Sequence, residues 1–144
     1  HWGCEVMVFT RSPRHQEHAR ELGATWAGSL EDQPPHLLDR AVTFAPAGEL
    51  IPPILEKIQP GGTLAVNAVH LSDIPSFPYS LLYGERTLRS VANATRQDGV
   101  EFLKLAAEIP IQPTITVYPL EQVNQALADL KHSRFNGEAV LEIP

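Results

Sequence analysis

The chain has few of the residues on which several classes of protein depend. Its 144 residues include one cysteine, Cys4, which excludes an intrachain disulfide and a cysteine-rich zinc site. Because Cys4 begins an apolar run, we expect it to be a packed thiol. No apolar run reaches the roughly 18 residues that a membrane-spanning helix requires. The 11 lysines and arginines, against 17 aspartates and glutamates, form no basic stripe, so nucleic acids and membranes are not expected as partners.

What the sequence does contain is an alternation of strand and helix patterns. Apolar, β-branched runs predict strands at residues 4–10, 24–28, 40–44, 63–69, 88–92, 115–118 and 139–143. Periodic apolar residues predict helices over 13–22, 51–58, 95–109 and 120–132, and Pro110 is expected to end the third of them. Such alternation is typical of a parallel sheet. We therefore predict an α/β fold, a Rossmann-like doubly wound parallel sheet over residues 1–144.

A domain of this type normally opens with a strand and a glycine-rich turn, yet no G-x-G-x-x-G occurs in the chain. The first predicted strand and its helix, closed by Gly23, fit the second strand and second helix of a nucleotide-binding unit. We therefore expect a partial nucleotide-binding domain, lacking the first strand and the glycine-rich turn. In the strand order 3-2-1-4-5-6 the first strand lies between the second and fourth. Residues 1–38 and 39–144 are thus expected to share no ladder.

Three phrases, in order along the chain, resemble the carboxy-terminal half of medium-chain, zinc-type alcohol dehydrogenases. They read VFTRSPRHQEHARELGA, LEKIQPGGTLAVNAV and YPLEQVNQALADLKHSRFNGEAVLEI. The run HLSDIPSFPYSLLYGERTLRSVANATRQDGVEFL is similar to the zinc-binding, propanol-preferring branch. The resemblance implies the cofactor-binding part of an enzyme that transfers a hydride between NADP(H) or NAD(H) and a primary alcohol or aldehyde. The composition, with a single cysteine, fits a cytoplasmic location. It implies further that the catalytic domain and its zinc lie outside these residues, so that this chain alone is inactive.

The end of the first predicted strand bears on the choice between NADP and NAD. In an NAD-binding domain this strand ends in Asp or Glu, which accepts hydrogen bonds from the adenosine ribose. The matching position is Thr10, and Arg11, Ser12 and Arg14 follow it. A hydroxyl and guanidinium groups suit a 2′-phosphate, so we expect NADP, with NAD as the alternative. The competing interpretation is a solvated helix start.

Two loops follow adjacent predicted strands at the sheet edge where open α/β sheets bind ligands. Their residues are Ala45, Pro46 and Ala47 in one loop and Asn67, Ala68, Val69 and His70 in the other. By the resemblance, these loops run along the nicotinamide ribose and ring, largely through backbone groups; the alternative is a pair of tight turns without a ligand. The imidazole of His70 suits a proton relay near neutral pH, but a lone loop histidine is more often a surface residue. No catalytic residue is assigned.

Other polar residues carry weaker signals. His15 and His18 are spaced i, i+3 on a helix, but they have no cysteine or carboxylate companion, so no metal ligand is assigned. Glu138 stands where the family commonly carries Arg or Lys against the pyrophosphate. Arg134 or Arg96 could contact a phosphate instead, and a surface role for either remains open.

Residues 74–83 (IPSFPYSLLY) are rich in apolar and aromatic side chains. They could simply pack in the core, but the resemblance implies a contact between subunits, and a homodimer or homotetramer. Two other functions stay open. One is a zinc-independent quinone or enoyl reductase of the same superfamily, and the other is a non-catalytic nucleotide-binding module.

Overall fold

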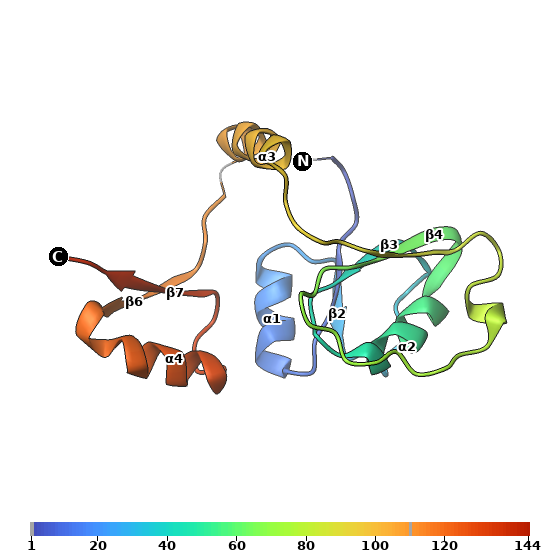
Figure 1. The fold of residues 1–144 in the computed structure, drawn as a ribbon, viewed down its shortest axis with the longest axis horizontal. Coiled ribbons are helices and arrows are strands. Elements are labelled where there is room, and N and C mark those ends of the chain that lie inside the picture. The colour runs from blue at the N-terminus through green and yellow to red at the C-terminus, as the bar shows by residue number, and fades with distance from the viewer. Residues whose placement is uncertain (1, 110) are drawn as a thin grey trace. The chain divides into compact units, whose positions relative to one another are not determined.

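The computed structural model describes residues 2–109 and 111–144, which form two compact units. One unit comprises Gly3–Thr95, and the other comprises residues 96–144 with Trp2. In the described residues every strand pairs in parallel with a neighbour, and helices connect the paired strands (Figure 1). This confirms the predicted α/β fold. The assignment of residues 1–144 to one nucleotide-binding domain stays a prediction, and Pro110 lies outside the described residues.

The first sheet is a single parallel βαβ unit. It contains β1 (Met7–Phe9), α1 (Pro13–Glu21) and β2 (Trp26–Gly28). The Ser12 side chain caps α1 by accepting a hydrogen bond from the His15 N–H, and proline occupies the first turn, where its missing N–H costs nothing. Gly23 follows the helix at φ +100°, a conformation that a side chain disfavours.

The prediction of a packed thiol at Cys4 is wrong, because Cys4 is exposed. The strand expected over residues 4–10 is shorter in the structure, where β1 begins only at Met7. Cys4 therefore lies before the paired part of the strand, and the sheet does not bury its side chain.

The second sheet has the order β3-β4-β5, with all pairs parallel. Its elements are β3 (Leu38–Thr43), the short helix η1 (Gly48–Leu50), α2 (Ile51–Glu56), β4 (Ile58–Val66), the short helix η2 (Tyr79–Leu81) and β5 (Thr87–Ser90). Ile58, predicted at the end of a helix, is instead the first residue of β4. The reason lies in the residue before it: the Lys57 carbonyl accepts the Leu38 N–H at 2.8 Å, so the ladder begins there.

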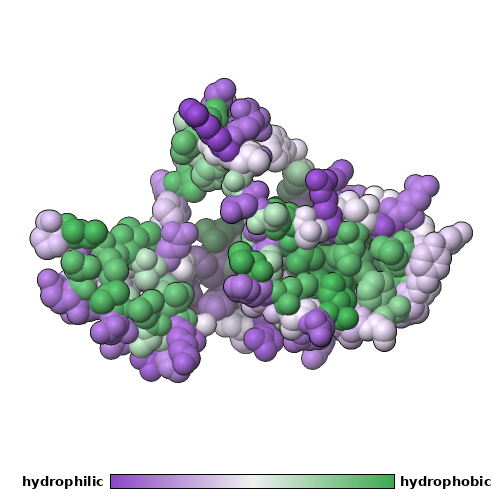
Figure 2. All heavy atoms as spheres, viewed as in Figure 1, coloured by the Kyte–Doolittle hydropathy of each residue, from purple (hydrophilic) through white to green (hydrophobic). Residues whose placement is uncertain are grey.

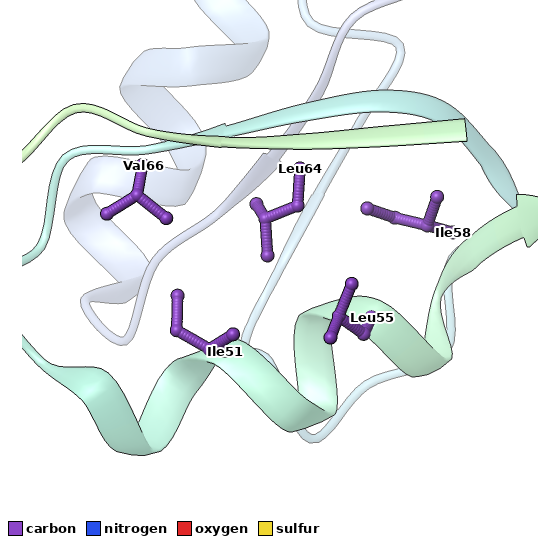
Figure 3. Close-up of a cluster of buried hydrophobic side chains, with 5 residues drawn as sticks. All are labelled: Ile51, Leu55, Ile58, Leu64 and Val66. Atoms are coloured by element: carbon purple, nitrogen blue, oxygen red, sulfur yellow. The ribbon is translucent and has the colours of Figure 1, made fainter. Parts of the chain in front are cut away.

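The core of this unit lies between α2 and β4. Ile51 and Leu55 of α2 pack against Ile58, Leu64 and Val66 of β4, and four of these five side chains are fully buried (Figure 3). Leu38 and Ala41 of β3 and Leu88 of β5 flank the cluster. Since burial of apolar area supplies about 25 cal/mol per Å², this cluster anchors α2 to the sheet.

As expected, the first two strands share no ladder with the later ones: among the described residues, β1 and β2 pair only with each other. The expected boundary after residue 38 is one residue too late, because Leu38 already pairs with Ile58 of β4. Side chains link the two sheets instead. The His36 Nε2 lies 3.0 Å from the Glu5 carboxylate, and the His36 Nδ1 lies 3.0 Å from the Leu37 carbonyl. Both oxygens only accept hydrogen bonds, so together they favour the doubly protonated ring. The Leu37 carbonyl, and next the Glu5 side chain, raise the pKa of His36, while His36 lowers the pKa of Glu5.

This link predicts a pH-dependent stability. Stabilisation through His36 is fully present below its ordinary pKa of 6.5 and is lost as the pH rises through its raised folded value. Stabilisation through Glu5 is present above its ordinary pKa of 4.5 and is lost as the pH falls through its lowered folded value. The melting temperatures of the chain and of His36→Gln should therefore differ most between about pH 4.5 and pH 6.5. The difference should shrink by pH 9.

His132→Gln is the matched control, since it removes another exposed histidine. The melting-temperature difference between the chain and His132→Gln should show no maximum between about pH 4.5 and pH 6.5. A melting-temperature difference for His36→Gln that stays constant from pH 5 to pH 9 would show that the ion pair contributes nothing.

The C-terminal unit contains α3 (Arg96–Glu108), β6 (Ile115–Pro119), the short helix η3 (Leu120–Gln122), α4 (Val123–Lys131) and β7 (Glu138–Glu142). Asp129 of α4 ties this helix to β6 by accepting the Tyr118 hydroxyl at 3.0 Å, and it also accepts Gln125 and Arg134. Burial raises the pKa of Asp129, but these hydrogen bonds outweigh burial and lower it.

Alternate residues of β6 and β7 are exposed, and several of them are apolar. Figure 2 shows hydrophobic side chains gathered on the visible face of this unit. Ile115, Val117 and Val140 are 40% to 53% exposed. Among the described residues, none of the helices is both long and apolar enough to cross a membrane.

Candidate cofactor site

Thr10, the residue that follows β1, is held through its backbone on two sides. Its N–H donates to the Gly28 carbonyl at 2.8 Å, which extends the pairing of β1 with β2 by one bond. Its carbonyl accepts the Gln16 side-chain amide of α1, also at 2.8 Å. Both bonds use backbone atoms of Thr10, so neither occupies its hydroxyl.

The predicted residues after Thr10 form the start of α1. Ser12 caps the helix, whereas Arg11 and Arg14 are exposed. No acidic residue lies in the first turn. A helix start already favours anions through its free N–H groups and its dipole, and here two guanidinium groups add to that preference. The segment at 10–14 therefore carries the Thr10 hydroxyl, the capping residue Ser12 and two arginines.

The two predicted loops come together in the structure. They leave the carboxyl ends of the paired strands β3 and β4, where the Asn67 N–H donates to the Thr43 carbonyl at 2.8 Å. Farther along, the Ser72 N–H lies 3.4 Å from the Pro46 carbonyl. In the first loop Ala45 and Ala47 are half-buried and Pro46 is exposed. In the second loop Ala68 is half-buried, while Asn67, Val69 and His70 are exposed.

The residues that join these loops were not predicted from the sequence. The N–H of Gly48 donates to the Ser72 hydroxyl at 2.8 Å, and this hydroxyl lies 3.3 Å from the Glu49 carboxylate. Gly48 is buried, and a Cβ on it would overlap the carbonyl oxygens of Ser72 and Asp73. Nothing in the local sequence indicates the partner of Gly48, which lies 24 positions away.

Two of the weaker candidates pair with carboxylates on their own elements or close by. The Nδ1 of His18 is 3.3 Å from the Glu21 carboxylate, so His18 pairs along the helix with Glu21. Within the described ranges, His, Cys, Asp and Glu residues form no group of three that could hold a metal ion. Arg134 pairs with Asp129 at 3.0 Å in the C-terminal unit, and a phosphate contact for it stays untested.

No family model matches the chain. It is 44% identical, over 142 residues, to a probable alcohol dehydrogenase, AdhA, of Mycobacterium tuberculosis. This match covers 98% of the chain but 41% of that protein, so the chain spans about two fifths of the curated relative's length.

The fold matches solved structures of the same kind. A cinnamyl alcohol dehydrogenase from Sorghum bicolor superposes with a TM-score of 0.86 at 23% identity, over 96% of this chain and 41% of its own. A Helicobacter pylori cinnamyl alcohol dehydrogenase in complex with NADP(H) gives 0.79 at 20% identity, over 96% and 41%. The Bacillus subtilis protein YhfP with NAD bound gives 0.74 at 20% identity, over 98% and 47%.

These likenesses extend over nearly the whole chain, and the parallel α/β architecture is Rossmann-like. The chain is homologous to alcohol dehydrogenases over the part of their length that it matches.

Proposed function

We propose that this chain binds the nicotinamide cofactor in an enzyme that transfers a hydride between NADP(H) and a primary alcohol or aldehyde. The name of the relative with 44% identity favours an alcohol dehydrogenase over a quinone or enoyl reductase. The observation that carries the cofactor assignment is the end of β1, where Thr10 stands in place of a carboxylate and two exposed arginines follow.

The residues at this site fit a 2′-phosphate by their chemistry. Arginine can bind phosphate through two parallel hydrogen bonds, and no carboxylate of the first helical turn repels the anion. An Asp or Glu at position 10 would accept hydrogen bonds from an unphosphorylated ribose but repel the phosphate. Among the solved structures described above, one holds NADP(H) and another holds NAD, so the shared fold by itself does not decide the preference.

In the reaction, this chain would bind and orient the nicotinamide cofactor. When bound, the cofactor supplies or accepts the hydride. Thr10, Arg11, Ser12 and Arg14 would hold its adenosine end, while the loops at 45–47 and 67–70 would hold its nicotinamide end, largely through backbone groups. None of the described residues is assigned to a metal, and zinc would be held outside this chain. We therefore expect the chain alone to have no dehydrogenase activity.

Two broader expectations belong to the same proposal. The segment at 74–83 carries Tyr79 and Tyr83, which are 73% and 67% exposed and stack edge to face with ring centroids 5.8 Å apart. Exposed aromatic pairs of this kind favour a subunit contact, hence a homodimer or homotetramer. A cytoplasmic location agrees with the single cysteine.

The test measures how substitutions at the end of β1 change the preference for NADPH over NADH. Arg11→Ala should weaken NADPH binding about tenfold, because a charge-assisted hydrogen bond contributes roughly 1.5–3 kcal/mol, and it should leave NADH binding nearly unchanged. Thr10→Asp should weaken NADPH binding further and strengthen NADH binding. Isothermal titration with each nucleotide gives both affinities.

Arg89→Ala, which removes an exposed arginine from β5, is the control for the loss of one positive charge. It should lower both affinities little and equally. Equal losses of NADPH and NADH affinity in Arg11→Ala would contradict the NADP assignment. An unaltered chain that binds neither nucleotide would contradict the proposed function.

A further inference from the structure

Lys57 is a buried cation that the proposed function does not use. It follows α2 and is only 6% exposed. Its backbone is fixed, because its N–H donates to the Ile54 carbonyl at 3.0 Å and its carbonyl accepts the Leu38 N–H at 2.8 Å. A buried ammonium group is costly unless it is partnered, so its contacts are informative.

The Lys57 ammonium group reaches from the second sheet to the first. Its Nζ donates to the Asp32 carbonyl at 2.9 Å and lies 6.0 Å from the centroid of the Phe9 ring. That ring in turn packs against Trp26 of β2, with centroids 5.0 Å apart. Lys57 therefore contacts both the end of β1 and the segment that follows β2.

Both contacts lead to the backbone around Thr10. Phe9 immediately precedes Thr10. Asp32 accepts the Ser29 N–H at 2.7 Å and the Ser29 hydroxyl at 2.9 Å through its carboxylate, and Ser29 follows Gly28, whose carbonyl accepts the Thr10 N–H. Gly28 is itself confined, since a Cβ on it would lie 2.6 Å from the Trp26 ring.

We propose that Lys57 is a positioning residue for the 2′-phosphate end of the cofactor site, acting on Thr10 and Arg11 through Phe9 and the Asp32–Ser29 turn. This inference rests on the proposed function of that site. The position of a phosphate-binding segment matters because a displacement of about 1 Å at a binding group can cost a large factor in binding or rate. Lys57 contacts Phe9 and the Asp32 carbonyl, so its proposed action does not require contact with the phosphate.

The test compares two probes that differ only in the phosphate that the site would read. Adenosine 2′,5′-bisphosphate carries the 2′-phosphate, and 5′-AMP lacks it. Global destabilisation lowers both affinities by the same factor, whereas displacement of the segment at 10–12 lowers the first selectively. The dissociation constant of 5′-AMP divided by that of the bisphosphate therefore separates positioning from stability. In Lys57→Met we expect this ratio to fall about tenfold, and in Lys57→Arg, which keeps a cation and its donors, by much less.

Arg86→Met is the matched control. Arg86 is a half-buried cation of the same unit that donates to the Ile58 and Tyr83 carbonyls, each at 2.7 Å, and contacts neither Phe9 nor the Asp32 turn. It should lower the melting temperature without changing the ratio.

Asp32→Ala keeps the inference testable if Lys57→Met fails to fold. The Asp32 side chain is exposed, so its loss should be tolerated, and it should lower the ratio about threefold by releasing Ser29. If Lys57→Met folds and leaves the ratio unchanged, the positioning role is overturned but the proposed site is not. If Lys57→Met does not fold, an unchanged ratio in Asp32→Ala has the same meaning. If the unaltered chain shows no preference for the bisphosphate, the proposed site and this inference fall together.

Discussion

Gly48→Ala should unfold or severely destabilise the loop junction at the carboxyl ends of β3 and β4. The new Cβ would overlap the backbone carbonyl oxygens of Ser72 and Asp73, and backbone cannot move aside as a flexible side chain can. Overpacking a buried site typically costs about 1–3 kcal/mol, and a clash with main chain on two consecutive residues belongs at the upper end. Any relaxation would also break the hydrogen bond from the Gly48 N–H to Ser72.

The effect on ligand binding should be as large as the effect on stability. Gly48 follows the loop that contains Ala45 and Ala47, and Ser72 lies two residues after His70. Separating the two segments would displace both parts of the predicted nicotinamide site. We expect NADPH affinity to fall about tenfold or more in isothermal titration, and the free energy of unfolding in urea to fall by about 3 kcal/mol.

Gly99→Ala is the control for replacing glycine as such. Gly99 lies within α3, and a Cβ there would meet open space. Alanine is favoured over glycine in a helix interior by about 0.5–1 kcal/mol, so this variant should be slightly more stable. A Gly48→Ala chain with unchanged stability and NADPH affinity would show that the loops are not packed as described.

Leu64→Ala should cost about 2–5 kcal/mol of the free energy of unfolding. Leu64 is fully buried at the centre of the cluster drawn in Figure 3, in the middle strand of its sheet. Its truncation loses apolar burial and leaves a cavity that α2 on one side and the ladder on the other can only partly fill. Marginally stable domains have about 5–15 kcal/mol in total, so a single substitution here removes a large share.

Urea unfolding followed by circular dichroism measures this loss. Leu22→Ala is the matched control, since Leu22 belongs to the same unit and is 68% exposed; it should change the free energy of unfolding by less than about 0.5 kcal/mol. Equal losses in the two variants would show that the cluster around Leu64 is not the core of the unit.

The strand and helix pattern was predictable because it depends on local spacing. Parallel pairing also predicts from the sequence that the loops at 45–47 and 67–70 lie side by side, as they do at the ends of β3 and β4. The ends of helices and strands were harder to predict from the sequence. The apolar residue Ile58 continues the helical spacing of α2 and fits a helix equally well, and only its pairing with Leu38, far along the chain, places it in β4.

Long-range contacts account for what the sequence did not show. A lysine after a helix is typical of a solvated C-terminus, and nothing near Lys57 indicates that its side chain is buried against Asp32 and Phe9. The same holds for the partnership of Gly48 with Ser72. By contrast, Thr10 and its neighbours were found because a strand and a helix closed by glycine fix their place. Their role in binding stays a prediction.

The way in which the strands pair also bears on how the chain folds. Every ladder in the described residues joins strands about twenty residues apart, with a helix or a short helical turn between them: β1 with β2, β3 with β4, β4 with β5, and β6 with β7. None of these ladders closes a loop across the whole chain, so the entropy lost on forming each one is small. Each crossover can therefore form early and by itself, during synthesis as well as in refolding. The docking of the sheets through contacts such as those of His36 and Lys57 would then follow as a later step.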